Sequence, residues 1–167
     1  MYISRLYIVF LILLITIYAK GCYSFTGGSA QPHLKTMQIQ NVIDNSGFGN
    51  PQYRELLTDN IIDLFLNDNT YEIVDLAGDA RLSVTISSIR ETPVSVSPGE
   101  LETERKIEIA CEVEFFDNIK KVVITKRTIS SYDIYAVSEA QQGREDAIRT
   151  ALSQLADDVL LAVISGW

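Results

Sequence analysis

The stretch IEIACEVEF at residues 107–115 places an apolar side chain at every second position. Successive side chains of a β-strand point to opposite faces of a sheet, so this pattern predicts a strand with one buried and one wet face. Cys111 is predicted to be a small buried hydrophobe, because no neighbouring residue would activate its thiol. The predicted buried set is Ile107, Ile109, Cys111, Val113 and Phe115.

Further strands are predicted on both sides of this stretch. A turn at Asp117-Asn118 separates it from an extended return segment, which is the pattern of a β-hairpin. The preceding connection, residues 91–105, contains two prolines and several glutamates and is predicted to be long and mobile. The predicted strands span residues 36–42, 81–89, 107–116 and 121–136, and a shorter extended segment covers 72–76.

Two amphipathic helices complete the pattern. Asn50 is predicted to cap the first helix and Pro51 to occupy its first position, where a missing N–H costs nothing. The capping-box pattern of residues 138–141, Ser-Glu-Ala-Gln, predicts the start of the second helix. Apolar residues recur at helical spacing in both segments, at Tyr53, Leu56, Leu57, Ile61, Leu64 and Phe65 and at Ile148, Leu152, Leu155, Val159 and Val163.

The order of these elements, β-α-β-β-β-α, predicts an α+β fold. Both helices would cover one face of a mainly antiparallel four-stranded sheet, which gives a two-layer sandwich. The other face of the sheet would be polar or would meet a partner. We expect one α+β domain over residues 36–167, a tether over 22–35 and a signal peptide over 1–21.

The amino terminus has the form of a secretory signal. Arg5 precedes an apolar run of 13 residues, 6–18, which is shorter than the roughly 20 residues that span a bilayer. The following Ala19-Lys20-Gly21-Cys22 resembles the lipobox of bacterial lipoproteins. This resemblance implies cleavage between Gly21 and Cys22 and a diacylglycerol lipid on the Cys22 sulfur. A secreted protein with a coincidental cysteine and a signal-anchor helix remain alternatives.

Composition argues against several function classes. The formal net charge of −8 is unfavourable for nucleic-acid binding. One histidine and two cysteines are too few for the usual structural zinc site, so no metal is expected. The histidine, His33, is expected to lie in the flexible tether away from any strand end, where it would be a poor catalytic base. Since no catalytic motif is present either, we do not expect an enzyme.

Basic residues nevertheless gather on the predicted hairpin. Lys120 and Lys121 lie near its tip, and Lys126 and Arg127 follow on the return strand, with Arg105 and Lys106 near its open end. The first four are candidates for contact with an anionic glycolipid or an acidic partner. Protection of an edge strand against pairing with other chains is the alternative interpretation.

Taken together, these features resemble the lipopolysaccharide-assembly lipoprotein family (LptE-like). The similarity rests on Cys22-Tyr-Ser-Phe-Thr-Gly, the Asn50-Pro51 helix, the hairpin and the terminal Ser165-Gly166-Trp167, in that order. It implies a lipid-anchored protein on the periplasmic side of the outer membrane that plugs and helps assemble an LptD-type β-barrel. It further implies a part in lipopolysaccharide transport and no cofactor besides the acyl lipid on Cys22. The alternative is another periplasm-facing lipoprotein adaptor, such as a cell-wall synthase regulator or a secretion pilot.

Overall fold

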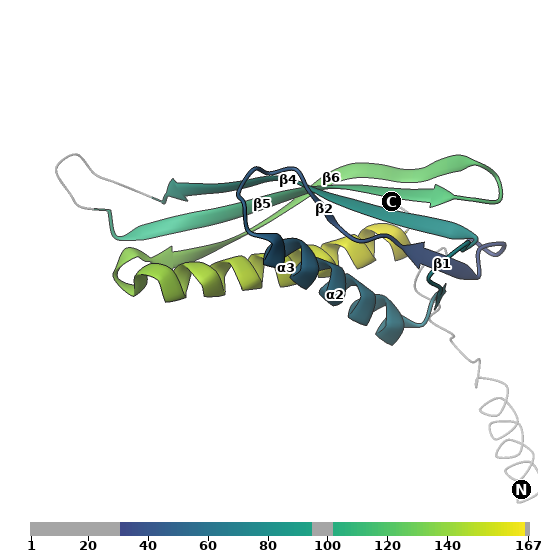
Figure 1. The fold of residues 1–167 in the computed structure, drawn as a ribbon, viewed down its shortest axis with the longest axis horizontal. Coiled ribbons are helices and arrows are strands. Elements are labelled where there is room, and N and C mark those ends of the chain that lie inside the picture. The colour runs from purple at the N-terminus through teal and green to yellow at the C-terminus, as the bar shows by residue number, and fades with distance from the viewer. Residues whose placement is uncertain (1–30, 95–101, 166–167) are drawn as a thin grey trace, which may run out of the picture.

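A computed structural model describes residues 31–94 and 102–165 and shows two helices beneath a sheet of long strands (Figure 1). The predicted signal peptide and Cys22 lie outside the described residues. The strands are β1 Thr36–Ile39, β2 Ile43–Asp44, β3 Glu72–Ile73, β4 Ala80–Pro93, β5 Glu104–Asp117 and β6 Val122–Ala136. The helices are α2 Pro51–Asp68 and α3 Ala140–Ile164, and a 3-10 turn, η1 Val137–Glu139, precedes α3.

The sheet has six strands and is mixed, so the predicted number of four is wrong although the α+β class is confirmed. Its order is β3-β1-β4-β5-β6, and β2 also pairs with β4. The β4–β5 and β5–β6 pairs are antiparallel, whereas β1 runs parallel to both of its neighbours. Parallel pairing follows from the path of the chain, because α2 crosses between β1 and the later strands. The strand β3 lies within the extended segment predicted over 72–76, whereas β2, with two residues, is too short for a periodic pattern to reveal.

The strands β4 and β5 are longer than the sequence predicts, whereas β6 agrees with the predicted 121–136 to within one residue. The β4–β5 ladder runs from Ala80 opposite Asp117 to Pro93 opposite Arg105, and so includes both ends of the predicted 91–105 connection. Polar residues extend the ladder there, since Arg90 lies opposite Glu108. Opposite charges on facing positions favour strand pairing, an effect that apolar periodicity cannot report.

The core lies between the sheet and the helices. All five members of the predicted buried set of β5 are at most 1% exposed, which confirms the alternation. Both helices pack on this one face, as predicted, and bury the α3 stripe from Ile148 to Val163 (Figure 1). Burial raises the pKa of the Cys111 thiol to about 12, with the Asp44 carboxylate adding to the effect. Cys111 is therefore a buried hydrophobe, as its position in the strand predicts.

The helix ends agree with the sequence at one helix and differ at the other. The Asn50 side chain accepts a hydrogen bond from the Gln52 N–H at 3.0 Å, and Pro51 begins α2, as predicted. The predicted capping box of α3 is wrong, because Ser138 lies within η1 and Glu139 precedes the helix without a side-chain cap. In the ranges 31–94 and 102–165 neither helix combines the length and apolarity that crossing a bilayer requires.

Candidate functional site

One face of the sheet faces away from both helices. The pairing register places Ser83, Thr85, Glu112, Thr128 and Ser130 on this open face, opposite in direction to the buried residues of the same strands. Two ion pairs lie on it: Lys106 Nζ is 2.7 Å from Glu108 on the same strand, and Lys126 Nζ on β6 is 3.3 Å from Glu114 on β5. The open face is therefore mainly polar, with Tyr132 and Ile134 as exposed apolar side chains near the end of β6, which agrees with one of the two outcomes that the sequence predicts.

A polar clamp fixes the β5–β6 turn. Asp117, at the end of β5, is 1% exposed, and its Oδ1 accepts hydrogen bonds from the N–H groups of Ile119 and Lys120, both at 2.8 Å. Its Oδ2 lies 2.6 Å from His33 Nε2. Burial alone would raise the pKa of Asp117, but the Lys120 N–H, His33 and the Ile119 N–H lower it. The carboxylate thus ties the turn to the chain segment that enters the domain.

The contact between His33 and Asp117 corrects the expectation for the single histidine. His33 contacts Asp117 at the end of β5, and the neighbouring Leu34 is only 4% exposed. Residues 33–36 are held further by Asp79, whose carboxylate accepts hydrogen bonds from the N–H groups of Lys35 and Thr36 at 2.9 and 3.1 Å. The Asp117 carboxylate therefore holds the imidazole in place, and residues 33–36 are packed against the domain and do not form a flexible tether.

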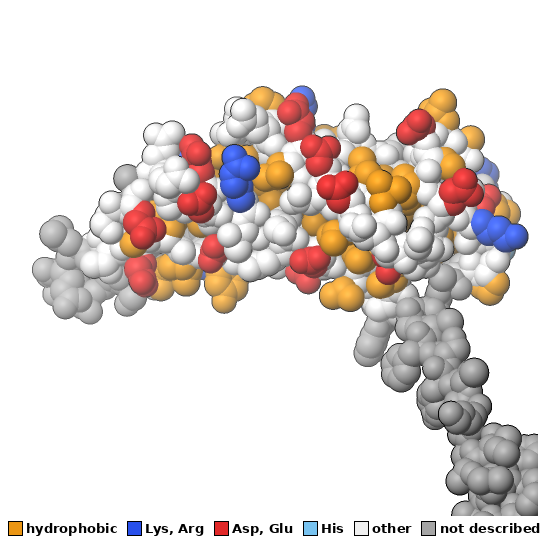
Figure 2. Space-filling model, turned by 90° about the horizontal axis from the view of Figure 1, so that it is seen from below, with side chains coloured by type: hydrophobic (Ala, Val, Ile, Leu, Met, Phe, Trp, Pro, Cys, Tyr) orange, Lys and Arg blue, Asp and Glu red, His pale blue; other side chains and the backbone are white. Residues whose placement is uncertain are grey.

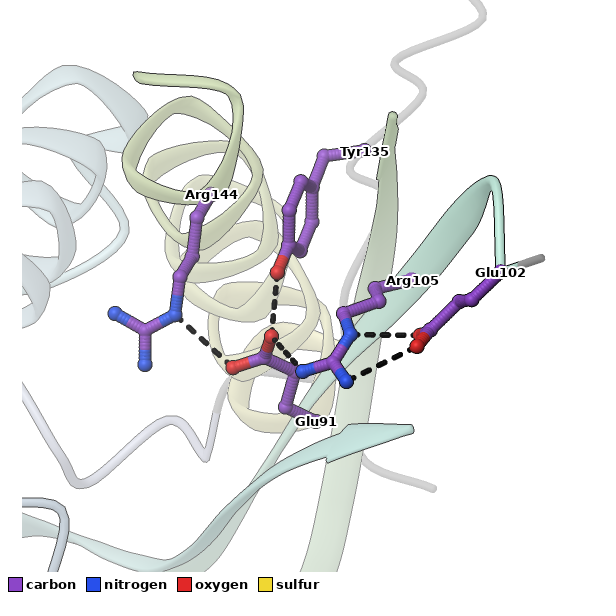
Figure 3. A network of polar contacts seen from close by, with 5 residues as sticks. All are labelled: Glu91, Glu102, Arg105, Tyr135 and Arg144. Carbon is purple, nitrogen blue, oxygen red and sulfur yellow. Dashed lines mark hydrogen bonds and ion pairs between the residues drawn. The ribbon is translucent and has the colours of Figure 1, made fainter. Parts of the chain in front are cut away.

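A second polar cluster lies at the opposite end of the long strands (Figure 3). Glu91 on β4 accepts hydrogen bonds from the Tyr135 hydroxyl, from Arg105 Nη1 at 2.9 Å and from Arg144 Nε at 3.0 Å. Arg105 also makes a bidentate pair with Glu102, at 2.6 and 3.1 Å. Burial would raise the pKa of Glu91, but the three donors outweigh it and lower this pKa to about 2.

The Glu91 cluster joins the ends of the long strands to α3. Its members come from β4, β5, β6 and α3, and the Arg144 guanidinium also lies 4.9 Å from the centre of the Phe48 ring. Sequence reasoning missed this cluster, because the residues are polar and far apart along the chain. Its geometry is that of a structural joint, in which one carboxylate satisfies three donors.

We expect Glu91→Gln to lower the free energy of unfolding by about 1–3 kcal/mol at pH 7, because a neutral amide binds the two guanidinium groups less strongly. The folded-state pKa of Glu91, about 2, lies below its usual 4.5. The stabilisation is therefore complete above pH 4.5 and lost as pH falls toward 2, so the difference between the two proteins should shrink over that range. Urea unfolding at pH 7 and at low pH measures it.

Glu112→Gln on the open face is the matched control, since Glu112 is exposed. Its effect should stay within about 0.5 kcal/mol at either pH. Equal effects of the two variants at pH 7 would contradict a structural role for the Glu91 cluster.

The structure does not gather the four predicted basic residues into one site. Lys120 and Lys121 are exposed in the β5–β6 turn, whereas Lys126 pairs with Glu114 on the open face. Arg127 lies opposite Val113 and so faces the helix side of the sheet, where it is exposed. Their contact with an anionic glycolipid stays a prediction.

Other hollows of the described surface show no catalytic arrangement. A depression of about 690 Å³ lies between residues 41–44 and α2 and has Arg54, Glu55 and Asp59 among its lining residues. Within residues 31–94 and 102–165, no group of three or more His, Cys, Asp or Glu side chains is placed to hold a metal ion. The depression is therefore a charged surface hollow.

Comparison with known proteins places the fold in a family. The family model described as lipopolysaccharide-assembly (LptE) matches residues 34–163. A search of curated proteins gave no match. Because the family match extends from the buried Leu34 at the entry of the domain to Val163 near the end of α3, it includes every strand and nearly all of both helices.

Solved structures share this architecture at low sequence identity. The hypothetical protein CT253 from Chlamydia trachomatis is 8% identical, with a TM-score of 0.60 over 78% of this chain and 95% of that one. Rare lipoprotein B from Shewanella oneidensis is 18% identical, with a TM-score of 0.53 over 74% and 90%. These likenesses show the fold, and the family match shows the membership: the chain belongs to the lipopolysaccharide-assembly (LptE) family.

Proposed function

We propose that this protein is an outer-membrane lipoprotein, anchored on the periplasmic side through acyl chains on Cys22, that plugs and helps assemble an LptD-type β-barrel. In this complex it takes part in the transport of lipopolysaccharide into the outer leaflet. The observation that supports the proposal best is the lipopolysaccharide-assembly family match over 34–163. The Gly21-Cys22 pair, which follows the short apolar run 6–18 after Ala19 and Lys20, gives independent support for the lipid anchor.

The surface of the domain suits the lumen of a barrel. The interior of a large outer-membrane barrel is polar, so a plug must present polar groups and not apolar ones to the wall. The open face offers hydroxyl groups and ion pairs, and the helix-covered side carries many acidic side chains (Figure 2). The three long strands give the domain an elongated form that can extend along a lumen (Figure 1).

The proposed role needs no catalysis. A plug acts by filling space and by stabilising its partner, so its polar clusters have structural tasks. His33 and Asp117 fix the β5–β6 turn, and Glu91 joins strand to helix. Their arrangement is consistent with a protein that binds and supports a partner.

The test is purification of the tagged full-length protein from its own membranes, followed by mass spectrometry. We expect co-purification with a barrel protein of much greater mass, and a diacylglycerol or triacyl mass on Cys22 of the same sample. An unrelated tagged lipoprotein, purified in parallel, identifies barrels that adhere to any lipid anchor. Recovery of a cell-wall synthase or a secretion component in place of a barrel would favour the adaptor alternative and contradict the plug.

A further inference from the structure

The β5–β6 turn combines exposed apolar and basic side chains. Ile119, Val122 and Val123 are 54%, 49% and 48% exposed, and Lys120 and Lys121 between them are also exposed. Exposed aliphatic side chains beside lysines are typical of segments that lie in a membrane interface, where apolar groups enter the headgroup region and ammonium groups meet phosphates.

The turn is built to hold this shape. Besides the Asp117 contacts, the Asn118 side chain donates to the Gly78 carbonyl and the Asn118 N–H to the Asp79 carbonyl, both at 2.8 Å. Lys121 adopts a left-handed backbone conformation, with φ of 59°. An added methyl group at Gly78 would come within 2.6 Å of the Gln38 backbone nitrogen, so this packing is tight. The apolar side chains are therefore presented by a fixed turn.

The turn also lies where the chain enters the domain. The His33–Asp117 contact of 2.6 Å joins the two, and both lie at the end of the molecule where the described chain begins (Figure 1). Figure 2 shows basic and hydrophobic side chains at this end, with acidic side chains beside them. Cys22 precedes Gln31 by nine residues, which reach at most about 32 Å when fully extended. A bilayer that holds acyl chains on Cys22 is therefore within reach of the turn.

We propose that the turn segment 119–123 contacts the bilayer in which Cys22 is anchored, with Lys120 and Lys121 on the phosphates of anionic phospholipids. Ile119, Val122 and Val123 then lie at the boundary between headgroups and acyl chains. This proposal rests on the lipid anchor of the proposed function. A second contact beside the anchor fixes the orientation of the domain, so that the long strands lie along the membrane normal and the Glu91 cluster lies at the end opposite the turn.

The test places a tryptophan at the turn of the acylated, membrane-purified protein. Val122→Trp is made in a Trp167→Phe background and reconstituted in vesicles of phosphatidylethanolamine and phosphatidylglycerol with brominated acyl chains. The matched control is Tyr132→Trp, on the same strand, with an exposure of 56% against 49% for Val122. Ten residues of strand separate the two positions by about 33 Å. We expect a blue shift and loss of emission for Val122→Trp and neither for Tyr132→Trp.

The charges are tested in the same background. Lys120→Glu/Lys121→Glu should restore the emission of Val122→Trp, whereas Arg149→Glu, a charge reversal at an exposed residue of α3, should leave it quenched. Replacing phosphatidylglycerol by phosphatidylcholine should likewise reduce the quenching. Equal emission of the two tryptophan variants in vesicles would overturn the proposal. A blue shift of Val122→Trp that occurs only when lipopolysaccharide is present would also overturn it, because the turn would then bind the glycolipid and not the phospholipids of the anchoring leaflet.

Two further measurements test the lipid anchor separately from the turn contact. The intact mass of each sample shows whether Cys22 is acylated, and barrel association is measured by co-purification. An acylated protein whose turn is not quenched refutes the turn contact alone, whereas an unmodified Cys22 in every sample refutes the proposed anchor.

Discussion

Cys22→Ala should move the protein from the membrane fraction to the soluble fraction while leaving its fold intact. Two or three acyl chains hold a protein at a membrane far more firmly than one, at about 0.8 kcal/mol per buried methylene group. Without the acyl chains, the protein would contact the membrane only through three aliphatic side chains and two lysines of the turn at 119–123. A high-salt wash should therefore release it from the membrane. Fractionation with such a wash, followed by circular dichroism of the released protein, measures both parts.

Cys111→Ala is the control for this experiment. Cys111 is fully buried in β5, so its replacement should lower stability by about 1 kcal/mol and leave the protein in the membrane fraction. Retention of Cys22→Ala in membranes after the wash would favour an uncleaved apolar segment 6–18 as the anchor, and would count against lipidation.

Phe115→Ala should lower the free energy of unfolding by about 3–5 kcal/mol, a large part of the stability of a domain of this size. Phe115 is 1% exposed in the core, and its ring centre lies 5.8 Å from that of Tyr71, which is 3% exposed. Removal of the ring leaves a cavity that the rigid strands on either side cannot close. Urea denaturation followed by circular dichroism measures the loss.

Phe116→Ala, one residue further on, is the matched control. Phe116 belongs to the open face, where its ring lies 5.0 Å from the Arg81 guanidinium carbon. Its replacement removes a partly exposed ring and one cation–π contact, which should cost about 1 kcal/mol. If Phe116→Ala proved as destabilising as Phe115→Ala, the assignment of buried and open faces would be wrong.

Periodicity in the sequence predicts the core of this fold well. The alternation over 107–115 and the stripe of α3 place Phe115 and Leu152 in the core, where each is at most 1% exposed. Both patterns arise from burial itself, which selects apolar residues at every position that faces the interior. The Asn50-Pro51 start of α2 is equally visible, because an N-cap is a local interaction.

The pairing of distant polar groups could not be predicted in this way. Glu91 meets Arg144 and Tyr135, and His33 meets Asp117, only because the strand register brings them together. No local rule links residues so far apart, and each polar side chain alone is consistent with an exposed position. The Asp117-Asn118 turn was visible as a turn, but the use of its carboxylate as a clamp depends on where the entering chain lies. The two-residue strand β2 was too short to leave a pattern, whereas β3 lies within the predicted extended segment 72–76.

The parallel pairing of β1 has a consequence for biogenesis. Met37 lies in register with both Ile73 on β3 and Ala80 on β4, and both of these strands follow it in the chain and are therefore synthesised later. A chain that emerges amino terminus first therefore presents an unpaired, partly apolar strand before its own partners have arrived. A chaperone that binds extended segments would therefore meet β1 first, before the β4–β5–β6 meander has been synthesised.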